Sequence, residues 1–211
     1  MADKLIIEGG TGEIVEKKSR FIATVEAVNS EEEAISFINA MKKKYWDARH
    51  NCMAYIVGDI KRFSDDGEPS GTAGKPMLDV LEGRNITNGV VVVTRYFGGV
   101  LLGTGGLVRA YQKATTKGLN NSVIAEKCEG YAGTVTTDYN GLGKIQYIAA
   151  NEMINLVNID YQENVVIDFA CEKDKYEVFI NKVTEATAGK AAISEKEELE
   201  FYKTENGIQI V

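Results

Sequence analysis

Two kinds of apolar periodicity follow one another in a fixed order through the second half of this 211-residue chain. Period-two alternation predicts strands, and 3.6-residue periodicity predicts helices. The order is strand 130–138, helix 141–151, strand 154–161, strand 164–171, helix 174–186 and strand 190–202, with Asn206-Gly207 predicting a turn into a final hairpin. This β-α-β-β-α-β order is the split βαβ, ferredoxin-like pattern, so the expected fold class is α+β.

The first half carries the same two periodicities around long glycine-rich segments. Ser30 predicts a helix N-cap, because Glu33 three residues later completes a capping box. Residues 58–76 hold both prolines of the chain and show no periodicity, so they are expected to form one long loop. The other elements expected are a strand region at 13–28, a helix after Ser30, a strand at 50–57, a short helix at 77–83, a buried strand at 89–96 and a helix after the glycines of 98–106.

Charge divides the chain near residue 128. Residues 1–128 carry 17 Lys and Arg against 16 Asp and Glu, whereas residues 129–211 carry 7 against 15. The net charge of −7 is therefore concentrated in the second half, which repels phosphates. We expect two domains, residues 1–128 and 129–211, with any contact to a polyanion on the first.

Composition and targeting signals exclude several classes of protein. The longest apolar run is far short of the ~20 residues that a membrane-spanning helix needs, and no secretory signal or lipidation motif is found. The three cysteines, Cys52, Cys128 and Cys171, lie far apart without a C-x-x-C motif. We therefore expect a cytoplasmic protein without a membrane partner, a disulfide framework or a cysteine zinc site.

The single histidine offers little for catalysis. His50 shares a strand face with Cys52, but residues two apart on a strand are separated by ~7 Å, too far for a ready hydrogen bond. We expect a satisfied, partly buried histidine. A binding role is the next alternative, and activation of a thiol nucleophile is less favoured still.

Carboxylates crowd the long loop at Asp65, Asp66 and Glu68. The spacing does not fit an EF-hand, so we favour turn chemistry around Gly67 over a hydrated magnesium ion. The Walker and dinucleotide-binding patterns both fail in the glycine-rich segments. No metal and no cofactor is expected.

A glycine-rich turn that leads into a helix is the strongest indication of a binding site. Gly103, Gly105 and Gly106 precede a helical stripe, and such a turn directs unpaired backbone N–H groups toward one point. Arg109 adds positive charge one turn later, and Arg95 ends the buried strand just before the turn. The alternative is that these glycines only permit close helix–sheet packing, with no ligand.

Basic residues from distant segments of the first half complete the candidate anion-binding site. They are Lys18, Arg20, Arg49, His50, Arg62, Lys75, Arg95 and Arg109. The hypothesis requires these side chains to gather beside the glycine turn. It loses its basis if they are scattered, or if each is neutralised by its own carboxylate.

Several short motifs between residues 17 and 111 form a highly specific ordered set. They are KSRFIA at 18–23, ARHNC at 48–52 with Ala54, SDDGEP at 64–69 with GTAG at 71–74 and Pro76, VVVTRYFGG at 91–99, and LG at 102–103 with GGLVRAY at 105–111. Together they resemble the IMPACT family, and its bacterial branch in particular. The resemblance supplies no catalytic residues.

The resemblance implies a first domain with the fold of the second domain of ribosomal protein S5. It implies a second domain like the ferredoxin-like end domains of elongation factor G. Eukaryotic members regulate translation by binding a ribosome-associated activator of a translation-initiation kinase. They carry an RWD domain in front, for which nothing before residue 17 is a candidate, so only a general connection to translation or RNA is expected here.

Three hypotheses about function follow. The leading one is a non-enzymatic protein that binds RNA, the ribosome or another polyanion, with Tyr96 and Phe97 either stacking on an unpaired base or packing against the helix. The rival is an enzyme acting on a small phosphorylated or acidic substrate held at the Gly103–Gly106 turn, with one of the three loop carboxylates as base or metal ligand. The third is a docking scaffold whose acidic second half binds a basic partner.

Overall fold

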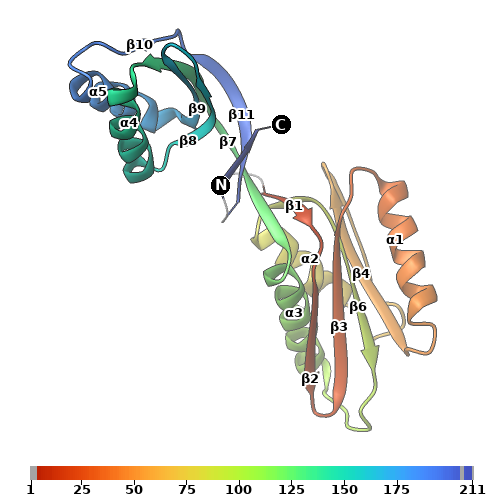
Figure 1. Cartoon of the computed structure of the whole chain (residues 1–211). Helices are drawn as coiled ribbons and strands as arrows, with labels where there is room; N and C mark the ends of the chain where they lie inside the picture. The colour runs from red at the N-terminus through yellow and green to blue at the C-terminus, as the bar shows by residue number, and fades with distance from the viewer. Residues whose placement is uncertain (1–3, 205–206, 211) are drawn as a thin grey trace. The chain divides into compact units, whose positions relative to one another are not determined.

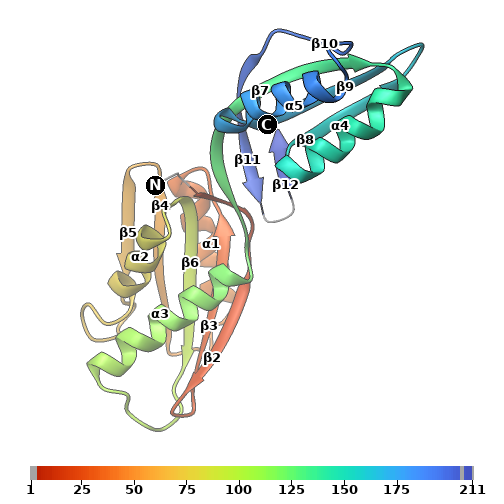
Figure 2. The same ribbon diagram turned by 90° about the vertical axis from the view of Figure 1, so that its left-hand side faces the viewer.

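The computed structural model describes residues 4–204 and 207–210 and shows a mixed α+β fold. The chain divides into two compact units, Met1–Glu126 and Lys127–Val211, called here the first and second units. The described residues form five helices (Figures 1 and 2). None of the helices within these residues is long and apolar enough to span a membrane.

The first unit is a sheet with helices on both faces. Its strands are β1 (Lys4–Glu8), β2 (Thr11–Glu16), β3 (Ser19–Ala27), β4 (His50–Val57), β5 (Ile60–Ser64), β6 (Ile86–Tyr96) and the first residues of β7 (Val123–Thr137), and its helices are α1 (Glu31–Lys44), α2 (Gly74–Gly83) and α3 (Thr104–Asn120). The strand order is β2-β3-β6-β4-β5, and β1 runs parallel to the start of β6. Helix α1 covers one face, while α2 and α3 cover the other (Figure 1).

Strand β6 lies at the centre of this sheet and is apolar on both faces, as its run of valines predicts. Val91 and Val93 belong to the core beneath α2 and α3, whereas Val90 and Val92 belong to the core beneath α1. All four side chains are fully buried. A central strand covered on both faces has no exposed side to fill with polar residues.

Two segments of the first unit differ from what the sequence predicts. The strand region 13–28 is a hairpin of β2 and β3, closed by Lys17 and Lys18, which both adopt positive φ. The expected loop 58–76 contains β5, which pairs with β4, and the first residues of α2. The β2–β3 turn has no glycine to indicate it, whereas Gly58 at φ 55° forms the two-residue turn between β4 and β5 with Asp59.

Gly98 is a point of close approach between β6 and the β2–β3 turn. Its backbone N–H donates to Ser19 Oγ at 3.1 Å, and a Cβ at this position would lie 2.0 Å from the carbonyl carbon of Lys18. Gly98→Ala is therefore expected to lower the free energy of unfolding by roughly 1–3 kcal/mol, measured by urea denaturation.

The matched control is Gly143→Ala in a helix of the second unit. A Cβ there meets nothing within 4 Å, so a gain of up to ~1 kcal/mol is expected. Equal stability of the two variants would contradict the close approach.

The second unit is a sheet with two helices on one face. Its elements are the rest of β7, α4 (Tyr139–Glu152), β8 (Asn155–Tyr161), β9 (Val165–Glu172), α5 (Lys173–Ala186), β10 (Ala192–Ile193), β11 (Glu197–Thr204) and β12 (Gly207–Ile210). The strand order is β8-β9-β7-β11-β12, with β10 also paired to β7. Ile145 of α4 and Phe179 of α5 pack on Phe169 of β9 to form the core.

The C-terminal segment of the second unit differs from the expected order of strands in one respect. Residues 190–202, expected as one strand, are the separate strands β10 and β11. Strands β11 and β12 pair as an antiparallel hairpin, which confirms the final hairpin. Asn206 of its expected turn lies outside the described residues.

Candidate functional site

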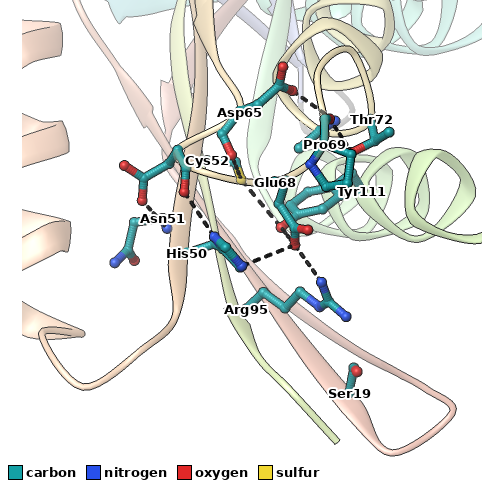
Figure 3. A network of polar contacts seen from close by, with 12 residues as sticks. Ser19, His50, Asn51, Cys52, Asp65, Glu68, Pro69, Thr72, Arg95 and Tyr111 are labelled. Atoms are coloured by element: carbon teal, nitrogen blue, oxygen red, sulfur yellow. Dashed lines mark hydrogen bonds and ion pairs between the residues drawn. The ribbon is translucent and has the colours of Figure 1, made fainter. Parts of the chain in front are cut away.

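A buried carboxylate lies at the centre of the most unusual polar cluster in the first unit. Glu68 belongs to the loop between β5 and α2, and its side chain is only 3% exposed. Its Oε1 accepts a hydrogen bond from an Arg95 guanidinium nitrogen (Nη1) at 2.6 Å and another from the Tyr111 hydroxyl at 2.8 Å. Figure 3 shows these groups converging on Glu68 from β6 and α3, with His50 of β4 beside them.

Strand register explains why these residues meet. In the sheet, Arg95 of β6 lies directly opposite His50 of β4 on one side and Phe21 of β3 on the other. Opposed residues point to the same face, which here is the face beneath α2 and α3. Tyr111 of α3 packs edge-on against Phe21, with ring centroids 5.2 Å apart, and this contact directs its hydroxyl toward Glu68.

Burial makes the Glu68–Arg95 pair sensitive to the loss of either partner. The Arg95 side chain is 7% exposed, and its guanidinium lies over the rings of Phe21 and Phe97, at 5.4 and 5.7 Å from their centroids. Its buried Nε has no hydrogen-bond partner among the residues that the structure describes. A charge in such a place is tolerated because its partner is within hydrogen-bonding distance.

Asp65 and Asp66 shape the loop that carries Glu68. The Asp65 carboxylate accepts the backbone N–H groups of Gly71, Ala73 and Gly74 at 2.8–3.0 Å, and so caps the start of α2. The Asp66 carboxylate accepts from the Asn51 backbone N–H at 2.7 Å and from Lys42 at 3.0 Å. These contacts give both carboxylates a structural role in the loop.

The tautomer of His50 follows from its partner. Nδ1 lies 2.8 Å from the backbone carbonyl oxygen of Asp66, which can only accept, so Nδ1 carries the hydrogen. In the neutral ring, Nε2 is then an acceptor, and it lies 3.9 Å from Glu68 Oε1. His50 is therefore a partly buried group whose Nδ1 is satisfied by a backbone carbonyl and whose Nε2 faces Glu68.

Cys52 is not placed as a nucleophile. Its thiol is fully buried and lies 3.0 Å from the Asp65 carbonyl oxygen and 3.3 Å from the Tyr111 hydroxyl. Burial raises the pKa of the Cys52 thiol and that of the Tyr111 phenol far above their usual values. Both groups therefore stay protonated at physiological pH, and the thiolate that nucleophilic catalysis needs does not form.

A cavity of about 340 Å³ opens beside the cluster. Arg49, His50, Glu68 and Arg95 form its polar part, and the first residues of α3 border it. Gly103 is the N-cap of α3 at φ 73°, a left-handed conformation that favours glycine, and no side chain caps the helix. The first N–H groups of α3 consequently have no partner within the helix.

The rest of the cavity wall is apolar. Phe97, Leu101, Leu102, Leu107 and Pro69 line it. Phe97 is 42% exposed and Leu101 is 81% exposed, so an aromatic and an aliphatic side chain stand open at the rim. The Arg49 guanidinium lies over the Phe97 ring at 5.8 Å from its centroid.

The expected anion-binding residues do not form one cleft. Arg49, His50, Arg95 and Gly103 border the cavity, while Arg109 and Gly106 line a separate, smaller hollow of about 120 Å³ with Lys17 and Lys113. Gly105 lies beside the Arg109 guanidinium in the first turn of α3. The structure thus places these side chains in two hollows, and residues of α3 line both of them.

Four other basic residues lie elsewhere, and two of them are neutralised. Arg20 forms a two-bond ion pair with Glu13 at 2.9 and 3.1 Å. Lys75 pairs with Asp79, one helical turn away on α2. Arg62 is exposed on β5 and donates to the Lys61 carbonyl, and Lys18 is part of the β2–β3 turn.

Sequence reasoning missed two features of the site. Tyr111 is 43 residues from Glu68 in the chain, and it reads only as part of the apolar stripe of a helix. The apolar rim at Leu101 and Leu102 reads as ordinary loop sequence between glycines. The described residues contain no cluster of three or more His, Cys, Asp and Glu placed to hold a metal ion.

Comparison with known proteins covers both units. The Impact N-terminal domain family matches residues 17–119, and a domain of unknown function, DUF1949, matches residues 135–190. The IMPACT family member YvyE of Bacillus subtilis (strain 168) is 43% identical over 205 residues, which cover 96% of this chain and 94% of that protein.

Two solved structures are also similar. The crystal structure of an hypothetical protein is 33% identical with a TM-score of 0.54, covering 93% of this chain and 99% of its own. The structure of the two-domain translational regulator Yih1 is 26% identical with a TM-score of 0.38, covering 55% of this chain and 47% of its own. The match along nearly the whole of YvyE, together with the two domain matches in order, shows that this chain belongs to the IMPACT family.

Proposed function

We propose that this chain is a non-enzymatic protein linked to translation, and that its first unit binds RNA, free or in the ribosome, at the cavity beside α3. The observation that carries the proposal is the composition of the cavity wall. It combines the exposed guanidinium of Arg49, the uncapped start of α3 and the exposed ring of Phe97. Family membership supports the link to translation.

Each part of this wall suits one part of an unpaired nucleotide. Free backbone N–H groups at a helix start and an arginine attract a phosphate. An exposed aromatic ring provides a stacking surface for a base, which is how unpaired RNA bases are usually held. Tyr96 is less suited to stacking, because its hydroxyl donates to Asp47 and the Arg20 guanidinium lies over its ring at 5.6 Å.

The set of proposed contact residues is smaller than the sequence suggests. Arg49 and the start of α3 form its centre, with Arg109, Lys18 and Arg62 as additional phosphate contacts outside the cavity. Arg20 and Lys75 contribute less than a free cation, because Glu13 and Asp79 offset their charges. The affinity should therefore depend on few phosphates and fall moderately with salt.

Arg49→Ala is expected to weaken binding of a single-stranded RNA about tenfold and to reduce the slope of log affinity against log salt by about 1. Fluorescence anisotropy with a labelled oligonucleotide at two salt concentrations measures both. The matched control is Arg84→Ala, which removes an arginine that donates to Asn120 at the other end of α3 and should change the affinity much less. Wild-type binding that is undetectable against both RNA and ribosomes, or that ignores salt, contradicts the proposal.

The enzyme hypothesis retains one observation in its favour. Glu68 is the only one of the three loop carboxylates that lines the cavity, since the other two shape the loop. A phosphoester hydrolysis screen with magnesium tests it. Turnover by the wild-type protein would support an enzyme and would count against the binding proposal as stated.

We also propose the finer fold assignments that the family resemblance implies. For the second unit, the order β8-β9-β7-β11 supports a ferredoxin-like domain, because it places the last strand of the β-α-β-β-α-β unit beside the first. For the first unit, the ribosomal protein S5 assignment agrees with a mixed sheet covered by helices. The proposed domains are residues 1–128 and 129–211, close to the compact units that divide after Glu126.

A further inference from the structure

The floor of the cavity presents hydrogen-bond acceptors. Oε1 of Glu68 already accepts two hydrogen bonds, from Arg95 and Tyr111. Within residues 4–204 and 207–210, no protein group donates to its other oxygen, Oε2. With its Nδ1 hydrogen directed at the Asp66 carbonyl, the neutral form of the His50 ring would add Nε2 as a further acceptor.

These acceptors are fixed in place before any ligand arrives. Arg95 and Tyr111 hold the Glu68 carboxylate, and the Asp66 carbonyl holds the His50 ring. Hydrogen bonds to the second oxygen of a carboxylate that is paired with an arginine are stronger than those between neutral groups. Glu68 and His50 therefore favour a ligand edge that presents donors, and Arg95, which also lines the cavity, can donate to an acceptor beside them.

Nucleobases differ in the donors on the edge used for pairing. Guanine presents two adjacent donors, an imino N–H and an amino group. Adenine and cytosine present one amino group beside an acceptor, and uracil presents one imino N–H between two acceptors. A base that turns an acceptor toward Glu68 and His50 places two acceptors opposite each other. That arrangement is unfavourable because neither atom supplies a hydrogen for a hydrogen bond.

The walls fit a planar ring that carries a phosphate. Phe97 and Leu101 offer apolar surface on which a base can lie, and Arg49 and the start of α3 offer a place for an anion. The volume of about 340 Å³ lies at the lower end of the ~300–1,000 Å³ range of ligand pockets, which suits one nucleotide.

From these contacts we infer that the cavity binds a guanine 5′-nucleotide, with the base edge on Glu68 and His50 and the phosphate at Arg49 and the start of α3. The inference rests on the proposed function and specifies which base it prefers. The guanine can come from an unpaired position in RNA or from a free nucleotide. Both sources share the chemistry that the cavity recognises.

Binding of mononucleotides by isothermal titration calorimetry tests the base preference. Guanosine monophosphate is expected to bind at least about tenfold more tightly than inosine monophosphate, which lacks only the amino group, and uridine monophosphate is expected to bind more weakly still. This pair of ligands avoids substituting Glu68, which also stabilises the fold. Arg49→Ala should weaken guanosine and inosine monophosphate by the same factor, because it contacts the phosphate.

Two single-stranded RNAs distinguish the sources and separate this inference from the proposed function. One is all uridine, and the other has a single guanosine at its centre. Preference for the guanosine-containing RNA supports both proposals, whereas equal salt-dependent binding of the two RNAs overturns the guanine inference and leaves RNA binding in place. Binding of guanosine monophosphate without binding of either RNA keeps the inference and overturns the proposed function. Equal affinity for guanosine and inosine monophosphate overturns the inference.

Discussion

Replacing Glu68 with alanine is expected to lower the free energy of unfolding of the first unit by about 3–5 kcal/mol. The substitution leaves the Arg95 guanidinium buried without its carboxylate, and the Tyr111 hydroxyl loses its acceptor. The cost comes mainly from the charge that remains in a place with little access to water. Urea denaturation followed by far-ultraviolet circular dichroism measures it.

A double substitution separates the ion pair from its packing. Glu68→Met combined with Arg95→Met removes both charges and keeps apolar bulk between Phe21 and Phe97. It should recover a large part of the loss, because replacing a buried ion pair with apolar side chains is often nearly neutral. A double variant that is less stable than Glu68→Ala would contradict the assignment of the loss to an unpaired charge.

The exposed ion pair on the β2–β3 hairpin provides the matched control. Glu13→Ala removes a carboxylate that holds an arginine, Arg20, in the same way that Glu68 holds Arg95, but in contact with water. The unfolding midpoint should barely change, because exposed ion pairs contribute little. A large loss from Glu13→Ala would mean that burial does not set the importance of these pairs.

The second large effect is expected from Phe169→Ala, at about 3–5 kcal/mol within the second unit. The Phe169 side chain is 1% exposed, and its ring lies 4.9 Å from that of Phe179 and 6.0 Å from that of Tyr176. Removing it leaves a cavity at the centre of the core that joins β9 to α4 and α5. Among the described residues, the buried core around Phe169 is made of residues of the second unit, so the loss should stay local.

Amide hydrogen exchange measures where protection is lost. Amides of β9 and α5 should exchange faster in Phe169→Ala, while those of β3 and β6 keep the protection they have in the wild type. Phe63→Ala is the matched control, because that ring is 46% exposed on β5 and its loss should change stability little. Equal loss of protection in β3 and β6 would show that the two units unfold together.

Elements with strong local signals follow from the sequence. Ser30 caps α1, and its hydroxyl accepts the Glu33 backbone N–H at 3.2 Å, as the capping box predicts. The central position of β6 follows from its apolar run, and the order of elements in the second unit follows from periodicity. In each case neighbouring residues in the chain carry the whole signal, since caps and periodic faces depend on residues only a few positions apart.

Two of the features that sequence reasoning missed are hairpins between consecutive strands. Strand β5 has little apolar character and exists because it pairs with β4. The β2–β3 turn uses two lysines at positive φ, where turn-forming residues such as glycine or asparagine are usual. Their local preference is overridden by the ladder of hydrogen bonds on either side.

The candidate site shows the same division. Its residue types are visible in the sequence, because basic residues, glycines and carboxylates gather in motifs between residues 17 and 111. Which cations remain free is decided by the fold, because Arg95 meets Glu68 across 27 residues of chain while Arg49 meets no carboxylate among the described residues. Charge and hydrogen-bonding capacity belong to single residues and can be read from the sequence. Neutralisation depends on strand register and loop closure, and only the tertiary structure brings two such groups within 3 Å of each other.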